Sequence, residues 1–155
     1  MSVQTGKKSL GMRWPSLEAE VVVDLLEDKA PAICEAMWAS LPFKSIQGHA
    51  LITGDMLFAT TPVTCLAREN VQLFTQMLVG ACFFGNSSQN FGVIYGEVTE
   101  PEGHSIWGQV RPEHIPILQR VGNATWDNLM LPWSPNGNSP RTKQHIVVEY
   151  RPLPS

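Results

Sequence analysis

The chain has 155 residues and a formal net charge of −3 without a long block of one sign, so it lacks the basic footprint of a nucleic-acid-binding protein. Apolar residues make up 43% and charged residues 16%, and this length fits a single domain over residues 1–155. No apolar run reaches the ~20 residues of a membrane span. Residues 1–12 lack the hydrophobic stretch of a signal peptide, so we expect a flexible tail there and a cytoplasmic protein.

The three cysteines do not indicate disulfides or a metal site. Cys34, Cys65 and Cys82 form an odd set without CxxC spacing, each in an apolar neighbourhood, which is typical of reduced thiols. No set of histidine, aspartate and glutamate has metal-ligand spacing either. We therefore expect neither a metal nor another cofactor.

The first half of the chain predicts a strand, a helix and a hairpin. Residues 17–26 (LEAEVVVDLL) are rich in β-branched residues and read as a strand with an apolar face. The stretch Asp28–Pro31 predicts a helix start, and Pro42 ends this helix. Residues 43–61 then alternate in period two around Gly54-Asp55 and predict a β-hairpin.

The second half predicts short strands and a second helix. Strands are expected at 81–84, 91–99, 106–110 and 144–151, and the loop 85–90 is interpreted as a connector. Residues 69–79 fit helix and strand equally well. Residues 112–121 predict a helix that stops at Gly122, and residues 123–141 predict a long loop whose role as a lid stays open.

Many short strands with only two helices predict a mainly β fold. The strands should pair mostly antiparallel, and closure into a barrel would remove the exposed sheet edges. The sequence therefore favours a barrel with two α-helices.

Several stretches resemble the cyclophilin family. The start Asp28-Lys29-Ala30-Pro31 with Trp38, the stretch 107–110 (WGQV) before the second helix, and 141–150 (RTKQHIVVEY) resemble cyclophilin segments in the same order. ACFFG at 81–85 and YGEV at 95–98 resemble small bacterial cyclophilin-like proteins. Residues 40–58 resemble the cyclophilin-like part of cucumopine and mikimopine synthase. The resemblance implies a closed cyclophilin-like β-barrel with two α-helices.

One departure from the family argues against prolyl isomerase activity. A prolyl isomerase of this family uses an arginine on a barrel strand, whereas the corresponding hairpin here, GHALITGDMLFATT, contains none. Without a guanidinium, the imide nitrogen has no electrostatic partner. We expect no competent isomerase.

The candidate catalytic residues are His49, Tyr95 and Glu97. His49 shares a strand face with Ser45 and Gln47, and this polar row faces either into the barrel, where His49 could transfer protons, or out to water. Tyr95 and Glu97 share another strand face, where a desolvated carboxylate could act as acid or base.

A second set of candidates could bind substrate. Trp107, Gln109 and Arg111 alternate onto one face and offer a stacking surface, an amide and a cation for a carboxylate. Ser45, Gln47 and Trp133 join this set. His104 and His114 are interpreted as parts of a solvated turn and a helix start.

Two classes of function follow. The first is a small-molecule enzyme with acid/base residues in the barrel; the resemblance to the opine-forming enzymes implies lyase-type condensation and cyclisation of histidine with a keto acid. The second is a non-catalytic small-molecule-binding or oligomer-forming barrel, because a fold does not fix a function. A homo-oligomer is compatible with both.

Overall fold

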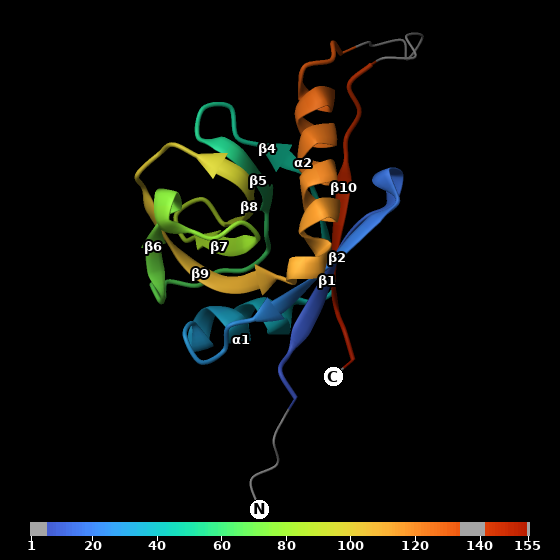
Figure 1. Ribbon diagram of the computed structural model, residues 1–155. Coiled ribbons are helices and arrows are strands. Elements are labelled where there is room, and N and C mark those ends of the chain that lie inside the picture. Colours follow the sequence, from blue (N-terminus) through green and yellow to red (C-terminus); the bar gives the residue numbers. More distant parts are fainter. Residues whose placement is uncertain (1–5, 134–141, 155) are drawn as a thin grey trace, which may run out of the picture.

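The computed structural model describes residues 6–133 and 142–154, and its strands form one curved antiparallel sheet (Figure 1). The strand order is β3-β10-β1-β2-β9-β7-β8-β5-β4, with β6 paired to β9. The sheet bends into a nearly closed barrel. Its strands are β1 Ser9–Trp14, β2 Ala19–Leu25, β3 Phe43–Ile46, β4 Gly48–His49, β5 Gly54–Thr60, β6 Val71–Leu73, β7 Ala81–Gly85, β8 Asn90–Val98, β9 Gly103–Val110 and β10 Val147–Pro152.

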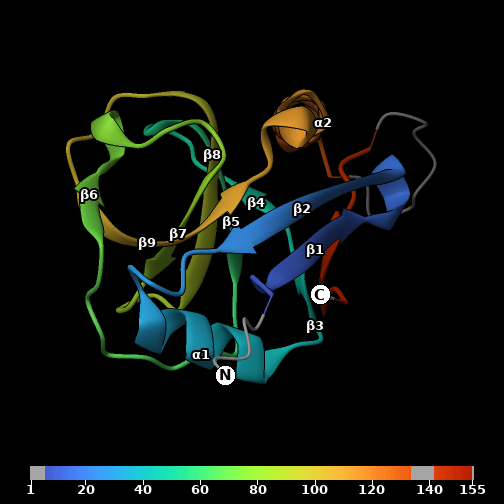
Figure 2. The same ribbon diagram turned by 60° about the horizontal axis from the view of Figure 1, so that its bottom comes forward.

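Two α-helices lie on opposite sides of the barrel: α1 Pro31–Ser40 and α2 Ile115–Leu129. In Figure 2, α2 is seen end-on above β2 and β9, and α1 lies below them. Three short 3-10 helices are η1 Pro15–Leu17, η2 Phe74–Gln76 and η3 Pro112–His114. Neither length nor hydropathy makes any helix within the described ranges a membrane span.

The strongest sequence signals are confirmed. The β-branched run forms β2, and its predicted apolar face, Val21, Val23 and Leu25, is buried. Helix α1 begins at Pro31, whose missing N–H costs nothing in the first turn. The Glu69 carboxylate accepts hydrogen bonds from the Ala32 and Ile33 N–H groups at this helix start, which satisfies two donors that the helix itself cannot.

Two expectations about element boundaries are wrong, and the structure answers one question that the sequence left open. Residues 9–12 are no flexible tail, because they belong to β1, where Leu10 and Met12 reach the core. Residues 43–61 form no continuous hairpin, since β3 pairs with β10 and only β4 pairs with β5. Residues 69–79 contain both β6 and η2.

The second helix does not stop at Gly122 but continues to Leu129, so part of the predicted loop is helical. Gly122 serves a contact instead: a Cβ added there would lie 2.5 Å from the Tyr95 ring. The glycine lets helix and strand β8 approach closely. Trp126 therefore lies on α2, while residues 134–141 of the predicted loop fall outside the described ranges.

Side chains fill the barrel interior. The buried rings of Phe91 and Trp107 meet edge to face at 4.5 Å, and Tyr150 packs against Phe91 at 4.7 Å. A second buried cluster lies on the other face of β5, β7, β8 and β9 and contains Met56, Phe74, Met77, Ala81, Phe83, Ile94 and Ile106. These strands are thus covered on both faces.

Gln47 joins the two ends of the strand order, since it lies between β3 and β4. Its N–H donates to Ile146 O at 2.8 Å. Its buried side chain accepts from Trp14 Nε1 at 2.8 Å and donates to Phe58 O at 2.8 Å. The amide therefore connects β1 and β5 where a continuous strand ladder is missing.

Replacement of this amide should destabilise the barrel. In Gln47→Leu, Trp14 Nε1 and Phe58 O lose their partners, and each unsatisfied buried group costs about 1–3 kcal/mol. We expect urea unfolding to show a loss of this size at an unchanged m-value. Gln119→Leu, at an exposed position of α2, is the matched control and should change stability little; an equal loss in both variants would contradict the role of Gln47.

An ion pair holds the end of β9 against β2. Arg111 donates from Nε and Nη2 to Asp24 at 3.1 and 3.0 Å, and Ser9 Oγ donates to the same carboxylate at 2.7 Å. Burial raises the pKa of Asp24, but the hydrogen bonds from Arg111 and Ser9 and the Arg111 charge outweigh it, so this pKa lies below its ordinary value of 3.8.

Because this pKa is lowered in the folded state, the ionised Asp24 stabilises the protein above its ordinary pKa, and the contribution disappears as the pH falls through the folded-state pKa. Asp24→Asn should therefore be less stable than the wild type at neutral pH, and the difference should shrink in acid. Urea unfolding over a pH series measures this, with the exposed Asp28→Asn as control. A difference independent of pH would refute the ionic contribution.

Candidate functional site

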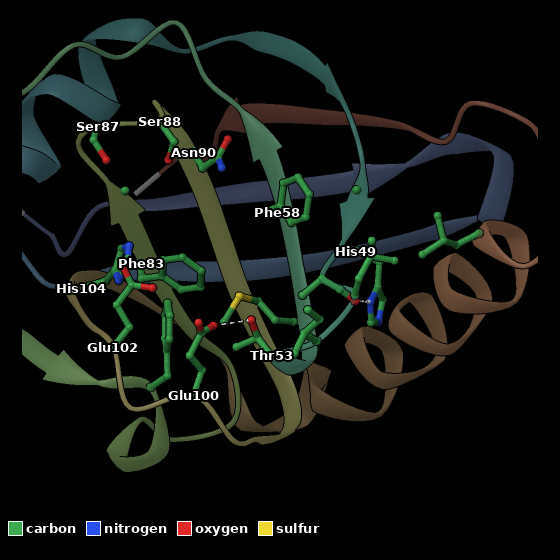
Figure 3. Close-up of a pocket in the computed structure, with 18 residues that line it drawn as sticks. His49, Thr53, Phe58, Phe83, Ser87, Ser88, Asn90, Glu100, Glu102 and His104 are labelled. Atoms are coloured by element: carbon green, nitrogen blue, oxygen red, sulfur yellow. Dashed lines mark hydrogen bonds between the residues drawn. The ribbon is translucent and has the colours of Figure 1, made fainter.

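A large cavity lies on the outer face of β5, β8 and β7, not inside the barrel (Figure 3). Its volume is about 700 Å³. Its apolar floor consists of Met56, Phe58, Phe74 and Phe83. A pocket of this size with an aromatic floor and polar groups around it is typical of a small-molecule site.

Small residues in the strands make room for the aromatic floor. A Cβ added at Gly92 of β8 would collide with the Phe83 ring, and one at Gly48 of β4 would lie 2.9 Å from the Phe58 ring. Phe74 meets Phe83 edge to face at 4.9 Å. Gly92 and Gly48 therefore leave the space that the rings of Phe83 and Phe58 occupy at the cavity floor.

The rim is polar and acidic. Thr53 Oγ1 donates to Glu100 at 2.7 Å, and Glu102 lies further along the same connection between β8 and β9. The loop between β7 and β8 contributes Ser87 and Ser88. This loop is thus more than the connector that the sequence predicted, because it borders the cavity.

His104 is a potential base in the cavity wall that the sequence interpretation missed. Its ring stacks on Phe74 at 4.7 Å and 17°, and meets Phe83 at 5.4 Å. Its Nδ1 is buried, without a hydrogen-bond partner among the described residues. Burial lowers the pKa of His104; the charges of Glu102 and Glu100 raise it and that of Arg68 lowers it, and the net effect is a lowered pKa. The ring is therefore neutral at neutral pH and can accept a proton.

His49 borders the same cavity from the side of α2, opposite His104 (Figure 3). It is only 7% exposed, so the polar row turns inward rather than to water. Nδ1 lies 2.6 Å from Ala50 O and Nε2 lies 2.6 Å from the Tyr95 hydroxyl. Because a carbonyl can only accept, Nδ1 carries a proton, while Nε2 shares a hydrogen bond with the Tyr95 hydroxyl.

Tyr95 stands between His49 and Asp55. Burial, together with the charge of Asp55 and a hydrogen bond to it, raises the pKa of Tyr95 to about 12, and Asp127 adds to this shift. Tyr95 is therefore a proton donor at neutral pH. Gly96 leaves the room for Asp55, which also accepts from the Glu97 N–H at 3.2 Å. A smaller cavity of about 270 Å³ lies beside His49, Tyr95 and Asp55 under Trp126.

The structure brings together some of the predicted site residues and separates others. Gln47 and Trp133 line a third cavity of about 150 Å³ that also borders His49, and Ser45 is half-buried on β3. Glu97 is exposed and does not line the large cavity. The carboxylate next to Tyr95 is that of Asp55.

The predicted face of Trp107, Gln109 and Arg111 does not reach the large cavity. Trp107 is fully buried in the core. The Gln109 side chain donates to Val79 O at 2.9 Å, and Arg111 is paired with Asp24. The sequence signal that could have located His104 is its alternation with Ile106, which places both on the outer face of β9.

Comparison with solved structures finds proteins of similar architecture. The chain superposes on the structure of McbB in complex with tryptophan with a TM-score of 0.78 and 28% identity, over 92% of this chain and 44% of that protein. A hypothetical protein from Archaeoglobus fulgidus gives a TM-score of 0.60 and 17% identity, over 97% and 98% of the two chains.

A cyclophilin-type peptidyl-prolyl cis-trans isomerase from Cryptosporidium parvum gives a TM-score of 0.53 and 10% identity, over 96% of this chain and 99% of the isomerase. Neither a family model nor a curated protein matches the chain. The chain spans less than half the length of McbB. The antiparallel barrel, its two helices and these superpositions together confirm the predicted architecture: the chain has the cyclophilin-like fold.

Proposed function

We propose that the chain binds a small molecule with an aromatic ring and an amino group in the large cavity, and promotes its condensation with a carbonyl compound by proton transfer. The observation that carries this proposal is the cavity itself. Its floor of Phe58, Phe74 and Phe83 suits a flat ring, and histidines border it on two sides.

The likeness to McbB supports the ligand class. The McbB structure contains tryptophan, which has both an aromatic ring and an amino group. Since this chain spans 44% of McbB, the transfer of that ligand class to this chain is part of the proposal. An aromatic amino compound also agrees with the condensation of histidine and a keto acid that the sequence resemblance implies.

The proposed reaction needs protons to move but no redox partner. The substrate's ammonium group first gives a proton to a base. The neutral amine attacks the carbonyl carbon, a C–N bond forms, and the oxygen leaves as water to give an imine, which takes up one proton. A ring carbon then attacks the protonated imine carbon, a C–C bond forms, and the ring proton passes to a base. The product equals the two reactants less one water.

His104 is our candidate for the base. Its ring is neutral at neutral pH, stacks in the cavity wall and has a buried nitrogen without a partner among the described residues. His49, hydrogen-bonded to Tyr95, is the candidate for proton shuttling on the other side. Glu97 takes no part in this scheme, because it is exposed and outside the cavity.

The activity test combines amines with carbonyl compounds. Tryptophan, tryptamine and histidine are each incubated with aldehydes and keto acids, and mass spectrometry detects a product equal to their sum less water. We expect His104→Gln to lower kcat/KM about 10²–10⁴-fold, the usual contribution of a general base. Because burial lowers the pKa of His104 below 6.5, wild-type kcat/KM should rise with pH through that lower pKa and stay flat through neutrality.

His145→Gln is the control, because His145 is exposed and does not line the large cavity. It should leave kcat/KM unchanged. Binding of an aromatic amine without turnover of any pair would favour the non-catalytic binding protein instead. Equal rates for wild type and His104→Gln would remove His104 from the mechanism.

The chain should not catalyse prolyl isomerisation, although its fold is that of a cyclophilin-type isomerase. No arginine or lysine lines the large cavity among the described residues, so a twisted imide nitrogen would find no cation there. A proline-peptide assay should give the uncatalysed rate. Acceleration proportional to the protein concentration would overturn this expectation.

A further inference from the structure

The large cavity has a strongly asymmetric charge. Two carboxylates, Glu100 and Glu102, lie on its rim, while the residues described around it include no lysine or arginine. Ser87, Ser88 and Asn90 add neutral polar groups. The cavity therefore offers an ammonium group two charged acceptors, which would repel a carboxylate at the same rim.

Neither Arg68 nor Arg111 lines the cavity. The charge of Arg68 shifts the pKa of His104 less than the charge of Glu102 does. The Arg68 side chain is exposed and does not line the cavity. Arg111 is engaged by Asp24 on β2. A carboxylate placed at the rim would thus meet two like charges without a compensating cation.

Hydrogen bonds hold the carboxylate of Glu100 and the main chain of Glu102. Thr53 donates to one oxygen of Glu100 at 2.7 Å. The main-chain carbonyl of Glu102 accepts from the Phe74 N–H at 2.8 Å, which fixes this residue beside the aromatic floor. Hydrogen bonds between charged partners are shorter and stronger than neutral ones, and fixed partners lose less conformational entropy on binding.

We propose that the ligand of this cavity is an arylalkylamine without a carboxylate, such as tryptamine, rather than an aromatic amino acid. The ammonium group lies between Glu100 and Glu102, and the ring lies on Phe58 and Phe83. This inference rests on the proposed function for its site, and it names the substrate class that the site prefers. It sets this chain apart from McbB, which was solved with tryptophan.

The test is a set of binding measurements without any carbonyl compound. Isothermal titration calorimetry of the full chain compares three ligands with the same indole ring. Tryptamine is a cation, L-tryptophan is a zwitterion and indole-3-propionate is an anion. We expect tryptamine to bind about tenfold more tightly than L-tryptophan, and indole-3-propionate to bind weakest. The preference should shrink in high salt, because exposed charges are screened.

Matched variants locate the effect. Glu102→Gln should remove most of the preference for tryptamine, whereas Glu97→Gln, an exposed carboxylate on β8 outside the cavity, should keep it. Equal losses in both variants would assign the preference to overall charge and overturn the inference. Phe58→Leu should weaken all three ligands alike, since it removes an aromatic contact with the indole from a half-buried position and leaves both carboxylates in place.

The outcomes separate the two proposals. Equal or tighter binding of L-tryptophan, or no binding of any of the three, overturns the amine preference. Condensation activity with an amino acid would then still support the proposed function. Tight, selective binding of tryptamine without turnover would support the substrate class and refute the catalytic role.

Discussion

The buried amide of Gln47 is the interaction on which the architecture depends. The strand order ends in β3 and β4, and these ends are neighbours in the chain, so a single residue has to bridge them. Gln47 does so with hydrogen bonds to Trp14, Phe58 and Ile146. An apolar residue could fill the same volume but would leave buried polar groups without partners.

The site lies on the outside of the barrel because the inside is full. Tyr95 and Trp107 turn inward and meet packed side chains. On the outer face of the neighbouring strands β5 and β7, Phe58 and Phe83 form the cavity floor. His49 and Tyr95, which the sequence placed on separate strand faces, form a hydrogen-bonded pair. It lies at the end of the barrel, where α2 covers it.

Sequence periodicity predicted the elements that a single face defines, such as β2 and α1. It failed where a residue serves a distant partner. Gly122 has the local signature of a helix end, yet the helix continues through it. A glycine is needed there because the ring of Tyr95, far away in the chain, leaves no room for a side chain. His104 follows a proline, a glutamate and a glycine that read as a solvated turn, and only its stacking on Phe74 reveals its burial. The alternating Trp107, Gln109 and Arg111 share a face, but pairing with β2 gives that face to the core and to Asp24.

Strands β5, β7, β8 and β9 are covered on both faces. One face packs the main core, and the other face carries the second cluster and borders the cavity. Inward residues such as Leu57 and Val93 belong to the main core, whereas their neighbours Phe58 and Ile94 face the other side. Exchanges on the outer side can thus reshape the ligand space while the inner packing persists. A barrel of this kind is able to diversify its chemistry without rebuilding its scaffold.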